Sequence, residues 1–142
     1  MQKSKNATAH ISGGKAYPCL SGKAEFHQIK DSVWVIVRVL GLPENSTGFY
    51  ALHIHDGESC EGQGFPLTDG HYNPDGNPHP MHQGDLPPLL SNNGAAYMAV
   101  MTDRFTVNEI IGKTVIIHSD ADDFTSQPSG NAGSKIACGI IQ

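Results

Sequence analysis

One segment, residues 52–90, constrains the fold of this chain more than any other. It reads LHIHDGESCEGQGFPLTDGHYNPDGNPHPMHQGDLPPLL and interrupts a sequence that otherwise alternates in the manner of β-strands. Glycine and proline are frequent in it, and these residues permit turns and remove ladder hydrogen bonds. So long a loop is uncommon in a compact domain unless it has a function or is held from within. We therefore expect a functional loop that internal links tie to a β-framework.

The same segment concentrates groups that bind metals. Five of the eight histidines of the chain lie in it, together with four aspartates: His53, His55, His71, His79, His82, Asp56, Asp69, Asp75 and Asp85. Buried polar groups cost free energy unless each finds a partner, so this composition is unsuited to an ordinary core. Imidazole nitrogens suit copper and zinc, and a carboxylate can complete a zinc shell. A metal is the simplest link that would hold the loop.

His53 and His55 would stand on the same side of a strand, because alternate strand residues share a face. Such a pair alone is a weak signal, and two surface histidines are the favoured interpretation of an isolated pair. His118, at the end of a later expected strand, could join them in a second nitrogen site. Copper accepts imidazoles in a tetragonal arrangement and cycles between two oxidation states.

A second group has the spacing His-x7-His-x2-His-x2-Asp, formed by His71, His79, His82 and Asp85. Three nitrogens and one oxygen make a closed tetrahedral zinc shell, which is typical of a structural site. The alternative is a solvated polar loop, but a loop of this length without an anchor would be mobile. His71 stands between the two groups, and an imidazole has two nitrogens with which to join two metals.

The rest of the chain predicts an all-β fold. Strands are expected over residues 7–12, 22–29, 33–40, 49–55, 94–102, 114–119 and 135–141, and residues 106–111 could form one helical turn. Short strands with turn residues between them favour a sandwich or a flattened barrel of about eight antiparallel strands. Residues 56–90 and 120–134 are expected to be its two long functional loops. A length of 142 residues fits one domain, over residues 1–142.

Charge and apolar content exclude several functions. The formal net charge of −5 argues against nucleic acid as a partner, since phosphate binding needs a basic surface. No apolar run approaches the length of a membrane span. The start, MQKSKNATAHI, lacks the apolar region of a signal peptide, so the protein either stays in the cytoplasm or has lost a leader.

Three widely spaced cysteines do not form a CxxC site. One disulfide and one free thiol would favour an oxidising compartment, and hence an exported protein in the cell envelope or outside the cell. A cytoplasmic location stays open, and so does the oligomeric state, for which a homodimer is one possibility.

Taken in order, five motifs resemble the copper/zinc superoxide dismutases, in a bacterial-type form. They are LHIHDGESC, GHYNP, HPMHQGDLPPL, IGKTVIIHSDADD and GNAGSKIACGII, and the resemblance covers nearly the whole chain. It implies a Greek-key β-barrel and the disproportionation of superoxide to dioxygen and hydrogen peroxide, with copper cycling between Cu(II) and Cu(I). Zinc would be structural.

The resemblance also implies a role for each motif residue. Copper would be bound by His53, His55, His71 and His118, and zinc by His71, His79, His82 and Asp85. Cys60 and Cys138 would form a disulfide. Asp122 would link His53 to His79 and fix both rings, as carboxylates behind metal ligands do. His71 would bridge the metals and deliver a proton to the bound anion.

Two features depart from the family pattern. Lys135 stands where the family usually has an arginine beside copper, which keeps the positive charge but loses the planar fork that grips an anion. We expect a working site that is slower or less selective for anions. The segment 120–134 also looks shorter than in animal enzymes, with fewer charged residues to guide superoxide.

Two other functions are weighed against the enzyme. One is a metal-binding relative without turnover, against which the complete copper set argues. The other is a copper store, which would favour exposed thiols or methionines for Cu(I). Elsewhere, Trp34 is expected to pack, and Arg38 and Arg104 are expected in ion pairs. His10 and His27 are expected to face solvent, and Cys19 has no expected partner.

Overall fold

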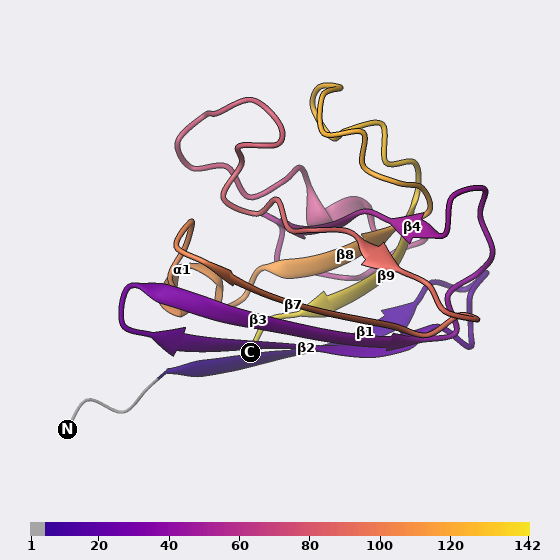
Figure 1. Cartoon of the computed structure of the whole chain (residues 1–142), viewed down its shortest axis with the longest axis horizontal. Helices are drawn as coiled ribbons and strands as arrows, with labels where there is room; N and C mark the ends of the chain where they lie inside the picture. Colours follow the sequence, from indigo (N-terminus) through magenta and orange to yellow (C-terminus); the bar gives the residue numbers. More distant parts are fainter. Residues whose placement is uncertain (1–4) are drawn as a thin grey trace.

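The computed structural model describes residues 5–142, and almost all of its regular structure is β (Figure 1). The elements in chain order are β1 (Asn6–Gly13), β2 (Ser21–Ile29), β3 (Ser32–Leu40), β4 (Phe49–Tyr50), β5 (Leu52–His55), the 3-10 turn η1 (Pro66–Thr68), β6 (Leu89–Leu90), β7 (Ala96–Thr102), α1 (Val107–Ile110), β8 (Thr114–His118) and β9 (Lys135–Ile140). The expected all-β class is confirmed. The start of the chain was expected to lack the apolar region of a signal peptide, and its first four residues, MQKS, lie outside the described residues.

Seven strands form one antiparallel sheet in the order β5-β8-β9-β1-β2-β3-β7, and β4 and β6 form a small second sheet. The large sheet curls into a half-barrel, and both long loops rise from the same side of it (Figure 1). The last strand, β9, lies in the middle of this sheet, between β8 and β1. This arrangement brings β5 and the end of β8 together beneath the two loops.

Alternation in the sequence explains which side of each strand is buried. In β3 the residues Val33, Val35 and Val37 are fully buried, and the residues between them face outward. β-Branched side chains pack well on such a half-buried surface. Opposite them, the ring of Phe26 meets that of Phe105 edge-on, with centroids 6.3 Å apart. Trp34, for which a packing role is expected, lies on the outward face of β3 with 47% of its surface exposed.

The expected strand over residues 49–55 is divided at Ala51. Before this residue, Phe49 and Tyr50 pair with β6, and after it β5 pairs with β8. Ala51 itself donates to the carbonyl of Asp120 and accepts from the amide of His118. The segment therefore changes strand partners at Ala51, and the same residue holds the backbone of His118 and Asp120 in place. The helical turn expected near residues 106–111 is confirmed as α1, which Thr106 and Glu109 cap reciprocally.

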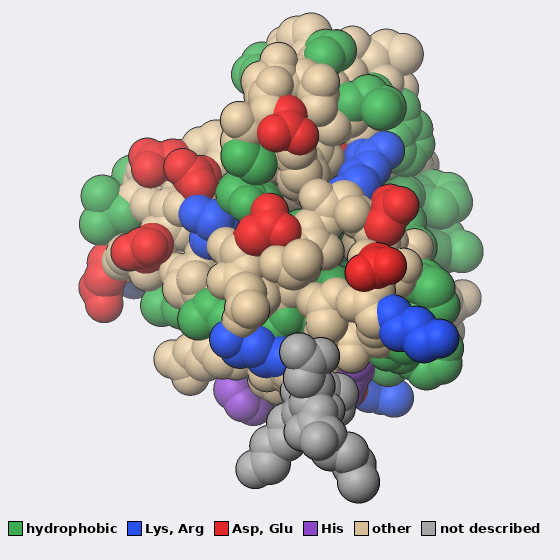
Figure 2. Space-filling model, turned by 90° about the vertical axis from the view of Figure 1, so that its left-hand side faces the viewer, with side chains coloured by type: hydrophobic (Ala, Val, Ile, Leu, Met, Phe, Trp, Pro, Cys, Tyr) green, Lys and Arg blue, Asp and Glu red, His purple; other side chains and the backbone are tan. Residues whose placement is uncertain are grey.

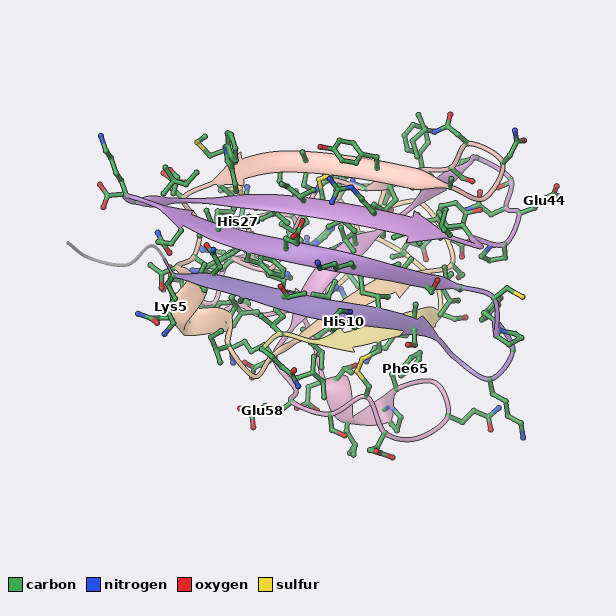
Figure 3. The ribbon with its side chains drawn as sticks, turned by 90° about the horizontal axis from the view of Figure 1, so that it is seen from below. Lys5, His10, His27, Glu44, Glu58 and Phe65 are labelled. Atoms are coloured by element: carbon green, nitrogen blue, oxygen red, sulfur yellow. A yellow bond between two sulfur atoms is a disulfide. The ribbon has the colours of Figure 1, made fainter. Side chains whose placement is uncertain are left out.

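A disulfide between Cys60 and Cys138 joins the long loop to β9, as the resemblance implied. It packs with Phe65 and Ile116, and Figure 3 shows Phe65 beside it. The remaining cysteine, Cys19, is exposed and free among the described residues. The first part of the loop is thus held to the sheet covalently.

Charged groups of both signs are interspersed on the face shown in Figure 2, with no single basic patch on that face. His10 and His27 lie on β1 and β2, on the side of the sheet seen in Figure 3. Among the described residues, no helix has the length and apolar character needed to cross a membrane.

Candidate metal centre

Backbone pairing brings the histidine segments together. His53 and His55 lie on β5, opposite Ile116 and Thr114 of β8. The long loop then returns along β5, so that His55 pairs with His71 and His53 pairs with Asp85. His118 is the last residue of β8, the strand that pairs with β5. Residues far apart in sequence therefore converge on one end of the half-barrel.

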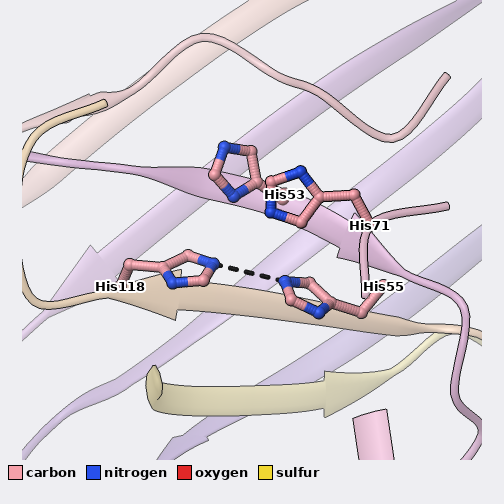
Figure 4. A group of neighbouring side chains, drawn as sticks. All are labelled: His53, His55, His71 and His118. Atoms are coloured by element: carbon pink, nitrogen blue, oxygen red, sulfur yellow. Dashed lines mark hydrogen bonds between the residues drawn. The ribbon is translucent and has the colours of Figure 1, made fainter. Parts of the chain in front are cut away.

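The first group consists of four buried or nearly buried rings, His53, His55, His71 and His118 (Figure 4). Each ring offers one nitrogen that lies within 4.8 Å of the others. The Nε2 atoms of His55 and His118 face each other at 3.2 Å, and the rings of His53 and His71 stack with centroids 3.9 Å apart. Four imidazole nitrogens around one point make a donor set that suits copper.

The second group gathers around the Asp85 carboxylate. Its Oδ1 lies 2.8 Å from Nδ1 of His71, and its Oδ2 lies 3.0 Å from Nδ1 of His79 and 3.3 Å from Nδ1 of His82. The Nδ1 atoms of His71 and His82 are 3.1 Å apart. Zinc bonds near 2.0–2.1 Å place the corners of a tetrahedron about 3.3 Å apart. The observed spacings are slightly shorter and fit such a shell.

Four ring nitrogens of these groups make no hydrogen bond within residues 5–142. They are Nδ1 of His53, Nε2 of His71, Nδ1 of His79 and Nδ1 of His118, each with almost no exposed surface, although Nδ1 of His79 lies 3.0 Å from Oδ2 of Asp85. A buried polar atom without a partner costs roughly 1–3 kcal/mol. Bound metal ions would satisfy those nitrogens that face the two groups, such as Nδ1 of His53 and Nε2 of His71. The residues therefore fit the metals that the sequence predicts.

Burial keeps three rings of the first group in the neutral form that binds metals. It lowers the pKa of His53 to about 4, that of His55 to about 2 and that of His118 to about 3. For Asp85, burial raises the pKa, but the hydrogen bond with His71 and the surrounding imidazoles outweigh it and leave the pKa below its usual value. At neutral pH the centre thus offers His53, His55 and His118 as neutral imidazoles and Asp85 as an ionised carboxylate, which are the ligand forms.

Asp122 links the two groups from behind. Its Oδ2 lies 2.9 Å from Nε2 of His53, and its Oδ1 lies 2.7 Å from Nε2 of His79. Burial raises the pKa of Asp122, but the hydrogen bonds with His53 and His79 outweigh this effect and leave the pKa well below its usual range. Each of these rings therefore points its other nitrogen, Nδ1, into the centre. Sequence reasoning expected these two partners for Asp122.

Lys135 contacts the loop segment Thr68–Asp69, which lies beside His55 of the first group. Its Nζ donates to Oγ1 of Thr68 at 2.8 Å and to the carbonyl of Asp69 at 3.0 Å. The same carbonyl lies 2.8 Å from Nδ1 of His55. Burial lowers the pKa of Lys135, and the negative charge of Asp69 partly offsets this. The amine is thus tied to the segment that orients one ring of the first group.

The sequence did not single out two side chains that contact the second group from outside. Gln127 bonds to the backbone of His79, and Arg104 donates to the carbonyls of Pro80 and His82. The expected ion pair of Arg104 is wrong within the described residues, whereas Arg38 does pair with Glu25. The spacing of residues 71–85 also did not reveal that His53 lies as close to the second group as to the first.

Residues 20–141 match the family model described as copper/zinc superoxide dismutase (SODC). The chain belongs to this family. It is 35% identical over 136 residues to "Superoxide dismutase [Cu-Zn] 2" of Aquifex aeolicus, an alignment that covers 85% of this chain and 78% of the relative. It is 32% identical over 133 residues to the enzyme of Legionella pneumophila, covering 88% and 80%. The rat extracellular enzyme is 31% identical over 136 residues, covering 87% and 55%.

Membership of the copper/zinc superoxide dismutase family makes this chain an oxidoreductase whose cofactors are copper and zinc. Two sets of side chains could hold metal ions, one formed by His53, His55, His71 and His118 and one formed by His53, His71, His79 and Asp85, and the disulfide is present. Family, cofactors and fold thus agree with the sequence prediction.

Proposed function

We propose that this protein disproportionates superoxide, converting two superoxide anions and two protons into dioxygen and hydrogen peroxide. The observation that carries the proposal is that His71 lies in both sets of candidate ligands with both ring nitrogens inside the centre, whereas His53, which also lies in both sets, has its Nε2 bonded to Asp122. Nδ1 of His71 faces Asp85 and His82, while its Nε2 has no partner among residues 5–142. One ring with two available nitrogens is what adjacent metals that share a ligand require.

In this proposal the copper ligands are His53, His55, His71 and His118, and the zinc ligands are His71, His79, His82 and Asp85. When bound, copper supplies one-electron chemistry, and zinc supplies a fixed positive charge. Asp122 holds the rings of His53 and His79 in the orientation that both sites need.

His71 has a second task in this proposal. When its Nε2 is not engaged by a metal it can hold a proton, while Nδ1 stays with the zinc group. That proton is then available to the departing peroxide, which is a general-acid role. The bridging ring would therefore couple electron transfer to proton delivery.

An anionic substrate also needs attraction. The chain carries a formal net charge of −5 and repels anions at long range. Lys135, bonded to Thr68 and Asp69 beside His55, supplies a local positive charge next to the first group. We assign it the task of drawing superoxide towards the copper site.

The direct test loads the purified protein with copper and zinc, counts both metals, and measures the disappearance of superoxide. We expect one copper and one zinc per chain and turnover that His118→Ala abolishes while zinc stays bound. Zinc uptake without turnover would indicate a non-catalytic relative. Copper uptake without turnover would indicate a copper store.

We also propose that the protein works outside the cytoplasm, in the cell envelope or beyond it. The Cys60–Cys138 disulfide favours an oxidising compartment, and one relative is named as extracellular. Fractionation of the source cells tests this, and a cytoplasmic signal contradicts it. Sedimentation at micromolar concentration tests whether the chain forms the homodimer that its sequence left open.

A further inference from the structure

The segment His79–His82 carries two of the proposed zinc ligands but belongs to no helix or strand. Such a segment needs other contacts to hold its rings at fixed positions. Its nearest internal bond runs from the amide of Met81 to the carbonyl of Pro78. At its far end, Oδ2 of Asp85 accepts the amide of His82 at 3.0 Å, and the amide of Asp85 donates to the carbonyl of His82 at 3.1 Å. No local bond holds the backbone of His79, and the other contacts of the segment come from two distant parts of the chain.

The first contact comes from Gln127, in the loop between β8 and β9. Its Oε1 accepts the amide of His79 at 2.8 Å, and its Nε2 donates to the carbonyl of the same residue at 2.8 Å. One side-chain amide thus satisfies both backbone groups of His79, much as a neighbouring β-strand would. The same Nε2 lies 3.1 Å from the carbonyl of Thr125, which helps to fix the side chain of Gln127.

The second contact comes from Arg104, in the connection between β7 and α1. Its Nη1 donates to the carbonyl of Pro80 at 2.7 Å and lies 3.3 Å from that of His82. Its Nη2 lies 3.9 Å from the sulfur of Met81. A charged donor makes stronger hydrogen bonds than a neutral one. Arg104 therefore holds the far end of the segment that Gln127 holds at its start.

A crevice beside the segment explains why these contacts matter. It has a volume of about 390 Å³ and is lined by Pro80, Asp85, Leu86, Arg104 and Phe124, among others. On this side the segment therefore lacks close packing at Pro80. Side-chain hydrogen bonds do here what close packing does elsewhere.

We propose that Gln127 and Arg104 are positioning residues for zinc, because they fix the backbone that carries His79 and His82. This inference rests on the zinc site of the proposed function. Groups behind the ligands typically change metal affinity 10- to 100-fold when they are removed. Neither side chain needs to touch the ion, since both act through the backbone of its ligands.

The test uses the copper-free protein, residues 1–142, and measures Zn²⁺ affinity by competition with a coloured chelator. We expect Gln127→Ala to weaken Zn²⁺ binding about 10- to 100-fold. Gln127→Glu keeps the acceptor but loses the donor, so its loss should be smaller. Arg104→Ala should weaken binding, and Arg104→Lys should restore part of the affinity because one donor remains.

The visible absorption spectrum of Co²⁺ bound in place of Zn²⁺ gives a second readout. At saturating Co²⁺ we expect the spectra of Gln127→Ala and Arg104→Ala to differ from that of the wild type, because the ligand geometry has changed. A general loss of stability would lower the unfolding midpoint of the metal-free protein without altering that spectrum. Gln63→Ala and Arg38→Gln, both at exposed positions away from the segment, are the matched controls.

Each result decides the matter. Weaker Zn²⁺ binding with an altered Co²⁺ spectrum in the variants, and neither change in the controls, supports the positioning role. Unchanged affinity, or an unchanged spectrum with lower stability alone, overturns it while the zinc site stands. A wild type that binds no Zn²⁺ overturns the zinc site and the inference together. If Gln127→Ala fails to fold, Gln127→Glu and Arg104→Lys give the same comparison.

Discussion

Oδ2 of Asp122 lies 2.9 Å from Nε2 of His53, at a point where both side chains are almost completely buried. The other carboxylate oxygen contacts His79, so one residue of the loop 120–134 touches both donor groups. Gly130 permits this approach. A Cβ atom there would overlap the Asp122 carboxylate and lie 2.6 Å from Nε2 of His79.

Asp122→Asn should weaken the binding of both metals. Asparagine keeps the shape but loses the charge, and its amide nitrogen cannot accept the bond that one of the rings donates. We expect affinities for copper and zinc about 10- to 100-fold lower, measured by chelator competition. Asp31→Asn, an exposed turn position, is the control. Equal affinities in the wild type and Asp122→Asn would show that the link is dispensable.

Gly130→Ala should destabilise the metal-free protein more than Gly76→Ala. Both glycines have positive φ, +74° and +67°, so both substitutions carry the backbone cost of roughly 1–2 kcal/mol. Only at Gly130 does the added Cβ meet other atoms, whereas nothing lies within 4 Å of it at Gly76. Urea unfolding gives the loss of unfolding free energy in each variant, and the difference between the two losses measures the cost of the overlap at Gly130. Equal losses would show that the overlap has no cost.

The metal-free protein should lose stability as the pH falls below 6.5. Burial lowers the pKa of His53 to about 4 and that of His118 to about 3, from 6.5 in the unfolded chain. Between these values the unfolded state binds more protons than the folded state, so a falling pH favours unfolding. We expect the urea midpoint to be flat above pH 7 and to drop steadily from pH 6.5 to about 4. Bound metals should reduce this slope. A constant midpoint from pH 7 to pH 5 would contradict the burial argument.

Removing the disulfide with the double variant Cys60→Ser and Cys138→Ser should cost about 2–5 kcal/mol of unfolding free energy. The bond closes a separation of 78 residues and anchors the loop that carries the second group. Zinc affinity should fall as well, because the loop gains freedom before it binds. Cys19→Ser, at an exposed free thiol, should stay within about 0.5 kcal/mol of the wild type. A double variant as stable as Cys19→Ser would show that the disulfide does not stabilise the fold.

Lys135→Glu should lower the rate of superoxide removal by roughly tenfold or more at low ionic strength, because a local attraction becomes a repulsion. The dependence of the rate on salt should weaken or change sign. Lys23→Glu makes the same change of charge on the outer side of β2 and serves as the control. A rate that is unchanged in Lys135→Glu at low salt would rule out steering by this residue.

Much of this architecture could be read from periodicity and spacing. Alternation located the main strands, and the spacing of His71, His79, His82 and Asp85 identified a set that the structure brings together. Periodicity failed where the chain changes partners, as at Ala51, and where an apolar residue faces outward, as at Trp34.

Contacts between a side chain and a distant backbone leave no periodic signal. The bonds of Gln127 to His79 span 48 residues, and those of Arg104 span 22 and 24. A single glutamine or arginine in a loop looks the same in sequence whether it contacts water or a carbonyl. Only the fold shows which backbone groups remain free for it, so these two residues could not be predicted.

The position of β9 in the sheet bears on how the protein is made. β9 is synthesised after β1 and β8, the two strands that it joins, and it carries both Lys135 and Cys138. Until β9 has been made, β1, β2, β3 and β7 can pair with each other, but β5 and β8 cannot join them through β9. We therefore expect metal loading and oxidation of the cysteines to follow the synthesis of β9.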